Sequence, residues 1–219
     1  MRELRKMSGT DFDDLVDFFD KMAQTKWLGA VHDQLKHLSG SWIDKVVLDI
    51  GCGTGRLLER GKGEASELIG IDLSPQMIEK SRLLLENAVA RTKMLVGDAY
   101  KLPIAEKSVD VALSTCVMFL LPEPQRGIAE MIRVVKPNGT LVMLNPSPKM
   151  SPETAATYAD SFEMGGFERD SLLAWSNVST KRHRYSNTEL DHLLRELGTR
   201  HVHHTHVLDG LATITVASK

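Results

Sequence analysis

The feature that most constrains the fold is a short apolar run that ends in closely spaced glycines. Val46–Ile50 is rich in β-branched residues, which favours a strand buried on both faces, and it leads directly into Gly51-Cys52-Gly53-Thr54-Gly55. Glycines at this point let the backbone turn sharply and approach a ligand without a Cβ in the way. A strand followed by such a loop is typical of α/β proteins that bind nucleotide-like ligands.

Strand-like and helix-like segments alternate after this loop. Further strand-like runs cover residues 68–71, 93–96, 109–114 and 140–144, and helical periodicity separates most of them. Ser74-Pro75 supplies an N-cap and an N1 proline to one of these helices. This alternation predicts a parallel sheet joined by right-handed crossovers.

Both ends of the chain depart from the alternation. Residues 1–44 have helical apolar periodicity and are expected to form a helical cover beside a Rossmann-like domain at 45–219. Ser186 and Glu189 form a capping box for a helix. Strand-like runs at 200–207 and 211–217 then follow, joined through Asp209-Gly210, a strong hairpin signal. The sheet should therefore finish in an antiparallel hairpin.

The composition indicates an ordinary globular protein. Lys and Arg total 27 and Asp and Glu total 29, so the net charge of −2 gives no electrostatic reason to expect nucleic-acid binding. The two cysteines follow no regular framework and are expected to be reduced thiols. The sequence shows neither a signal-peptide core nor an apolar run of about 20 residues. We therefore expect a cytoplasmic protein without membrane insertion, either a monomer or a homodimer.

Two charged residues narrow the choice of ligand. The dinucleotide fingerprint would place its third glycine at position 56, but this chain has Arg56 there and Gly55 one residue early. The loop therefore argues against a pyrophosphate and fits a neutral or zwitterionic chain. Asp72 ends the second strand-like run, roughly 20 residues after Gly53, where a carboxylate can accept hydrogen bonds from both ribose hydroxyls.

In combination, these motifs resemble those of class I S-adenosylmethionine-dependent methyltransferases. The resemblance covers about residues 46–144 and rests on the glycine loop, on Ile69-Gly70-Ile71-Asp72-Leu73-Ser74-Pro75-Gln76-Met77 and on Gly97-Asp98-Ala99. The small-molecule branch that includes the quinone-biosynthesis C-methyltransferases is the most similar. The resemblance implies a Rossmann-like, mostly parallel seven-stranded sheet of order 3-2-1-4-5-7-6, with an antiparallel last strand and helices on both faces. It also implies S-adenosylmethionine as the cofactor, S-adenosylhomocysteine as the product and a small-molecule methyl acceptor.

The resemblance further implies roles for the residues at matching positions. Those implied for cofactor binding are Asp49, Gly51, Cys52, Gly53, Asp72, Leu73, Met77, Asp98, Ala99, Ser114 and Thr115. Asp49 and the loop glycines would hold the methionine part, and Asp72 the ribose. The residues from Leu73 to Ala99 in this set would surround the adenine, with Asp98 at its exocyclic amine. Ser114 and Thr115 would border the transferred methyl group.

The sequence does not identify a general base. Residues 146–185 have weak periodicity and scattered prolines and glycines, so we expect a partly helical lid there. His183 and Tyr185 in this lid, and Asn145 before it, are the candidate catalysts, although each also fits a surface or packing role. The histidines between residues 201 and 206 would alternate between the two faces of a strand, so no metal site is expected.

The N-terminal helices leave two roles open. Residues 12–38 either fold over the cofactor, with Trp27 or the Lys21-Met22 region near the substrate mouth, or simply pad the edge of the sheet. The function also has alternatives. A non-catalytic S-adenosylmethionine-binding module remains open because a binding site does not prove turnover. A nicotinamide-dependent oxidoreductase is disfavoured by Arg56 and by the terminal hairpin.

Overall fold

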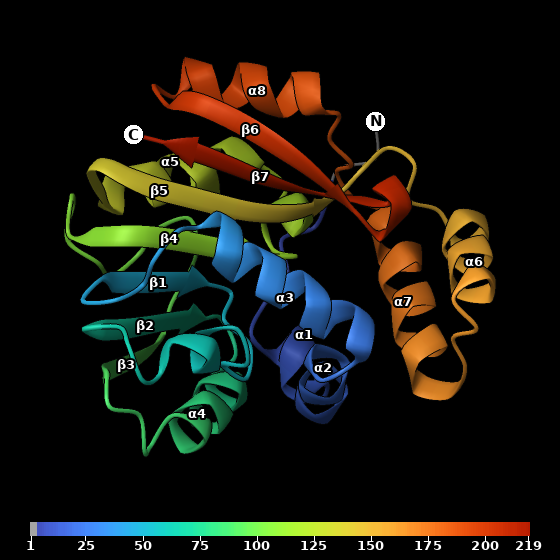
Figure 1. The fold of residues 1–219 in the computed structure, drawn as a ribbon, viewed down its shortest axis with the longest axis horizontal. Helices are drawn as coiled ribbons and strands as arrows, with labels where there is room; N and C mark the ends of the chain where they lie inside the picture. Colours follow the sequence, from blue (N-terminus) through green and yellow to red (C-terminus); the bar gives the residue numbers. More distant parts are fainter. Residues whose placement is uncertain (1–3) are drawn as a thin grey trace.

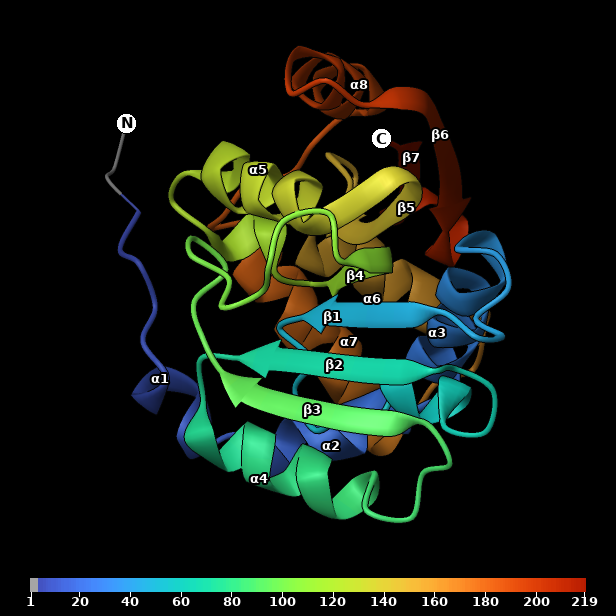
Figure 2. The same cartoon turned by 90° about the vertical axis from the view of Figure 1, so that its left-hand side faces the viewer.

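The computed structural model describes residues 4–219 and contains one seven-stranded sheet with helices on both faces (Figure 1). The strands are β1 Val46–Ile50, β2 Glu67–Asp72, β3 Arg91–Val96, β4 Val109–Thr115, β5 Val135–Pro146, β6 Arg200–Val207 and β7 Ala212–Ser218. Their order is β3-β2-β1-β4-β5-β7-β6, as predicted. Strands β1 to β5 pair in parallel, and β7 is antiparallel to both of its neighbours. Figure 2 shows β1, β2 and β3 side by side with their arrows pointing the same way.

The helices fall into two groups around the sheet. They are α1 Thr10–Asp13, α2 Val16–Ala23, α3 Lys26–Leu38, α4 Pro75–Leu84, α5 Pro124–Val134, α6 Pro152–Ser161, α7 Gly166–Ser179 and α8 Asn187–Glu196, with short 3₁₀ turns η1 Leu58–Gly61, η2 Met118–Leu120 and η3 Leu208–Gly210. Helices α3, α4, α6 and α7 contribute to one buried cluster, whereas α5 and α8 contribute to another. Val47 and Leu48 lie in different clusters because successive strand residues face opposite sides of the sheet.

The helix caps and the hairpin turn that the sequence predicts are present in the structure. The Ser74 side chain accepts a hydrogen bond from the Met77 N–H at the start of α4, with Pro75 in the first turn. Ser186 and Glu189 form the predicted capping box of α8. Asp209 and Gly210 have φ of 52° and 85°, the left-handed conformation that lets the chain reverse between β6 and β7.

One element differs from the sequence prediction, and the segment after the glycine loop is short. The loop leads into the 3₁₀ turn η1, where the Arg60 side chain donates to the Arg56 carbonyl (2.8 Å) and the Arg60 N–H donates to Leu57 O. Strand β5 begins at Val135, five residues before the predicted start at 140. Val135 pairs with Val109, and the intervening residues form a bulge before Thr140 pairs with Val111.

The N-terminal helices and the helices of the predicted lid lie together at one edge of the sheet. Figure 1 shows α1, α2, α6 and α7 beyond the ends of β1 and β2, on the side to which these arrows point. Trp27 of α3 stacks on Trp175 of α7 with ring centroids 5.7 Å apart, and Phe18 of α2 contacts Phe167 at 5.4 Å. The predicted lid at 146–185 therefore packs on the N-terminal helices. Within residues 4–219, no helix has the length and apolarity needed to cross a membrane.

Candidate functional site

A cavity of about 190 Å³ lies between the glycine loop and the N-terminal helices, at the carboxyl edge of the sheet. Every predicted cofactor residue except Ser114 lines it: Asp49, Gly51, Cys52, Gly53, Asp72, Leu73, Met77, Asp98, Ala99 and Thr115. The carboxyl ends of parallel strands are the usual ligand edge of an open α/β sheet. The structure thus brings together segments that are up to 66 residues apart in the sequence.

The glycine loop is hydrogen-bonded to the end of β2 and lines the cavity. The N–H groups of Gly51 and Cys52 donate to Ile71 O at 2.7 and 3.0 Å. Gly51 has φ of 75°, and a Cβ there would lie 2.1 Å from a Val117 methyl, so no other residue fits without movement. At Gly53, with φ of 52°, a Cβ would meet nothing within 4 Å. Gly51 is therefore required by packing, whereas Gly53 leaves free space beside the backbone.

Asp72 connects this loop to the start of α4. Its carboxylate accepts hydrogen bonds from the N–H groups of Gly53 and Ser74, both at 2.9 Å. Burial raises the pKa of Asp72 above its usual value, against the opposite effect of these backbone donors. Each carboxylate oxygen has two lone pairs, so acceptor capacity remains for hydroxyl groups of a ligand.

Asp49 is a buried carboxyl group in the cavity wall. It is 2% exposed, and its Oδ1 atom has no hydrogen-bond partner among the described residues. Burial, followed by the neighbouring charge of Asp72, raises the pKa of Asp49 to about 7. A buried carboxylate without a partner is costly, and a cation placed against it removes that cost. The site is therefore suited to a ligand with a positive group at this position.

The N-terminal segment closes the opposite end of the cavity. Lys6 forms an ion pair with Asp98, which also accepts a hydrogen bond from the Tyr100 N–H at 2.9 Å. Burial would raise the pKa of Asp98, but the hydrogen bonds from Lys6 and Tyr100 outweigh it and lower the pKa. Asp13 accepts a hydrogen bond from the Ser74 hydroxyl and ties α1 to the start of α4. None of these partners was indicated by a sequence motif.

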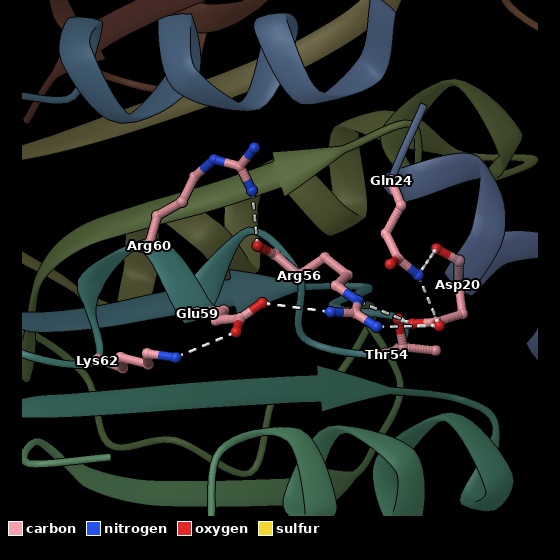
Figure 3. Close-up of polar contacts among 7 residues, drawn as sticks. All are labelled: Asp20, Gln24, Thr54, Arg56, Glu59, Arg60 and Lys62. Carbon is pink, nitrogen blue, oxygen red and sulfur yellow. Dashed lines mark hydrogen bonds and ion pairs between the residues drawn. The ribbon is translucent and has the colours of Figure 1, made fainter. Parts of the chain in front are cut away.

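Helix α2 is fixed to the glycine loop by Asp20 (Figure 3). The Asp20 carboxylate accepts two hydrogen bonds from Arg56, from Nε at 2.9 Å and from Nη2 at 3.1 Å. It also accepts one from the Thr54 hydroxyl at 2.8 Å. The Arg56 and Asp20 side chains are only 23% and 14% exposed, so solvent screens the pair weakly. Arg56, which in the sequence argues only against a pyrophosphate, thus anchors the N-terminal helices.

His32 of α3 is a cavity residue that the sequence analysis did not identify. It is 4% exposed, lines the cavity, and its Nδ1 atom has no hydrogen-bond partner among the described residues. Burial, followed by the charge of Arg60, lowers the pKa of His32 to about 3, so the imidazole is neutral at physiological pH. Leu28 and Leu35 bracket His32 on the buried face of α3, so in the sequence it reads as an ordinary packed histidine.

The predicted catalysts lie outside the cavity wall. His183 and Tyr185 belong to the link between α7 and α8, where the His183 N–H donates to Phe119 O at 3.2 Å and the two rings stack with centroids 5.7 Å apart. Asn145 is 1% exposed, and neither polar atom of its side chain has a partner among the described residues. Ser114 is buried in the same way, with an unpartnered hydroxyl.

The structure also places the residues that were expected near the substrate mouth and the segment that was expected to form a lid. Met22 lines the cavity, whereas Trp27 faces α7 and donates from Nε1 to the Ser171 hydroxyl at 3.3 Å. The cavity wall contains no residue from 146–185 among those described. Within residues 4–219, no group of three or more His, Cys, Asp or Glu side chains is arranged to hold a metal ion.

The central part of the chain matches a known family model. Residues 48–143 match the model described as a methyltransferase domain. A demethylmenaquinone methyltransferase from Desulfitobacterium hafniense is 36% identical over 111 residues, which cover 48% of this chain and 44% of the relative. The chain spans less than half the length of the curated relatives that it matches first.

Solved structures with the same fold extend over nearly the whole chain. A methyltransferase from Haloferax volcanii, described as putative and solved with the Trm112 methyltransferase activator, has a TM-score of 0.74 and 18% identity and covers 97% of both chains. The N-methyltransferase NodS from Bradyrhizobium japonicum, solved with S-adenosylhomocysteine, has a TM-score of 0.69 and 17% identity, covering 96% of this chain and 97% of its own. At such identities these likenesses establish the fold.

Proposed function

We propose that the chain is a class I S-adenosylmethionine-dependent methyltransferase, which binds S-adenosylmethionine in this cavity and transfers the methyl group to a small-molecule acceptor. The observation that carries the proposal is the buried, unpartnered carboxyl oxygen of Asp49 beside the glycine loop. This oxygen fits the ammonium group of the cofactor. The space beside Gly53, where a Cβ meets nothing within 4 Å, fits the rest of the methionine chain.

The remaining wall residues fit the other parts of the cofactor. Asp72 has spare acceptor capacity for the ribose hydroxyls, and Leu73 and Met77 supply apolar surface for the adenine. Asp98 would accept a hydrogen bond from the adenine amine beside its existing ion pair with Lys6. S-adenosylmethionine, when bound, supplies a methyl group already activated on a sulfonium.

The protein's own contribution to transfer is to position the reactants and exclude water. Phe12, Phe19 and Met22 from the N-terminal helices line the cavity opposite the sheet, and this apolar roof keeps solvent from the reacting atoms. We thus propose that residues 4–44 of the predicted segment 1–44 act as a cover, and residues 1–3 lie outside the described part of the chain. A role of His183 or Tyr185 as a base stays a prediction, because both lie beyond the cavity wall.

We further propose that the acceptor is a small molecule, that nucleic acid is not a substrate, and that the chain acts in the cytoplasm as a monomer or homodimer. The near-neutral charge and the two free cysteines support this proposal. The names of relatives suggest which acceptors to test first. They include a demethylmenaquinone methyltransferase, a malonyl-acyl-carrier-protein O-methyltransferase and an arsenite methyltransferase.

Two measurements test the proposed function. Calorimetric titration should show uptake of S-adenosylhomocysteine but not of NAD, and Asp72→Ala should weaken that uptake roughly 10- to 150-fold through the lost charged hydrogen bonds. Transfer of a radiolabelled methyl group should then occur to at least one acceptor in a panel of a naphthoquinol, a malonyl thioester, arsenite and small amines. Binding without transfer to a wider panel would favour a non-catalytic module, and uptake of NAD alone would favour an oxidoreductase.

A further inference from the structure

The amino-acid end of the proposed cofactor is a zwitterion and needs partners of both signs. Asp49 suits the ammonium, and the same negative charge repels the carboxylate that is attached to the same carbon. The carboxylate therefore requires a hydrogen-bond donor on another part of the wall. This requirement rests on the proposed function and concerns a group that the sequence motifs do not assign.

Most donor side chains in the wall are already engaged. Arg56 and Thr54 donate to the Asp20 carboxylate, and Lys6 pairs with Asp98 at the adenine end. Among the described residues, two side chains of the wall hold a donor-capable atom that is buried and without a partner, the imidazole of His32 and the hydroxyl of Thr115. These two are the candidates for the carboxylate.

The charges around the two candidates favour His32. Arg60 lies close enough for its charge to act on His32, and Arg56 lines the same cavity. Arg60 is held in place by its Nη2 donation to Gly29 O (3.1 Å), and its partner Asp33 is 72% exposed, so solvent weakens the opposing charge. The field at His32 is thus favourable to an anion. Thr115 ends β4, next to Cys116 and Val117, and no cationic side chain among the described residues forms a hydrogen bond with its hydroxyl.

We propose that the imidazole of His32 donates a hydrogen bond to the carboxylate of the cofactor. A neutral imidazole carries one N–H donor, and hydrogen bonds to a charged acceptor are the stronger class. Because His32 belongs to α3, the N-terminal cover supplies this contact while the sheet supplies Asp49. The cofactor's amino-acid end then bridges the two walls of the cavity, and the chain distinguishes it from adenosine derivatives that lack the carboxylate.

A pair of ligands that differ only in the carboxylate tests the proposal. The full chain is titrated calorimetrically with S-adenosylhomocysteine and with its decarboxylated analogue, which keeps the ammonium. His32→Leu is expected to weaken binding of the first about 10- to 100-fold and to leave the second within about twofold. His32→Gln retains a donor and should recover part of the loss. His37→Leu, on the exposed face of the same helix, serves as the matched control and should change neither affinity.

The other outcomes overturn the proposal. Equal weakening of both ligands by His32→Leu assigns the imidazole a structural role, and unchanged affinity for both removes it from the cofactor site. A carboxylate-specific loss in Thr115→Val, with none in His32→Leu, moves the contact to β4. If the unaltered chain takes up neither ligand, the proposed cofactor is wrong and this contact falls with it. If the unaltered chain binds both equally well, the carboxylate has no partner and only the further inference fails.

Discussion

The two walls of the cavity differ in how far their residues can be predicted from the sequence. The sheet wall, with the glycine loop, Asp72 and Asp98, is encoded in short motifs that follow strands β1, β2 and β3. The cover wall is lined by His32 of α3 and by Lys6, which precedes α1, and Asp20 of α2 fixes it to the glycine loop. Its contacts with the sheet side join residues that are 36 to 92 positions apart in the sequence. The comparison separates residues whose backbone position fixes their role from residues whose role depends on tertiary packing.

The largest effect is expected in the sheet wall, at the glycine that packing requires. Gly51→Ala places a Cβ 2.1 Å from Val117 at a φ of 75°, so it should destabilise the protein by about 2–5 kcal/mol through backbone strain and overpacking. Gly53→Ala has a φ of 52° but free space around its Cβ, so about 1–2 kcal/mol is expected. Urea unfolding measures both variants. Equal losses would mean that strain alone, and not the contact with Val117, determines the need for glycine at position 51.

A second large effect concerns the charge of Asp49. The pKa of about 7 means that its carboxyl is mostly protonated below that pH and must lose the proton before it can accept a hydrogen bond from the ammonium of the proposed cofactor. Affinity for S-adenosylhomocysteine should therefore rise with pH, reach about half of its maximum near pH 7 and level off above about pH 8, and at pH 5.5 it should be about 30-fold weaker than the plateau. The burial-raised pKa of Cys52 and the lowered pKa of His32 keep these neighbours uncharged in this range, whereas Asp72, whose pKa is also raised, changes in the same direction.

Calorimetry between about pH 5.5 and pH 8.5 measures this dependence. Asn at position 49 carries no titrating proton, so Asp49→Asn should bind weakly and with much less pH dependence. A wild-type affinity that is flat across the range would contradict the assignment of Asp49 to the ammonium.

The sheet wall was predictable because strand ends impose positions on the residues that follow them. Asp49, Gly51 and Asp72 lie in register because β1 and β2 pair residue by residue, from Val46 with Glu67 to Ile50 with Ile71. Once the strands were recognised, the parallel order placed these residues at one edge. The same reasoning failed at β5, where the early pairing of Val135 with Val109 and the following bulge leave no alternating pattern to read.

The cover wall could not be predicted from local patterns. Asp20 and Arg56 are 36 residues apart, and nothing in the spacing of apolar residues in α2 fixes which of its carboxylates meets the loop. His32 lies on the apolar face of its helix, where a histidine is more commonly a packed core residue than a ligand contact. For the same reason, the sequence could not show that the candidate bases in 146–185 lie outside the cavity wall. The helices of this segment pack on the cover, and α1, α2 and α3 line the cavity instead.

An intermediate effect is expected where the two walls are joined. Asp20→Asn keeps the side-chain shape and removes the charge that holds Arg56 and Thr54, so α2 loses its anchor on the glycine loop. For this partly buried pair we expect a loss of about 1–2 kcal/mol, seen as a 5- to 30-fold weaker affinity for S-adenosylhomocysteine. Asp33→Asn is the matched control, because Asp33 pairs with Arg60 but is 72% exposed and should contribute less than about 0.5 kcal/mol. Equal effects of the two variants would show that the cover is not coupled to the cofactor loop.

The smallest effect should appear in the stability of the free protein when the cover loses His32. A buried nitrogen without a partner stabilises nothing in the absence of ligand, and an apolar side chain of similar size removes its desolvation penalty. His32→Leu should therefore unfold at the same temperature as the wild type or, for a gain of about 1 kcal/mol, roughly 2–4 °C higher. With saturating S-adenosylhomocysteine the order should reverse, because ligand stabilisation follows affinity. Thermal denaturation with and without the ligand measures both states, and a variant that melts well below the wild type without ligand would show that the imidazole serves the packing of α3.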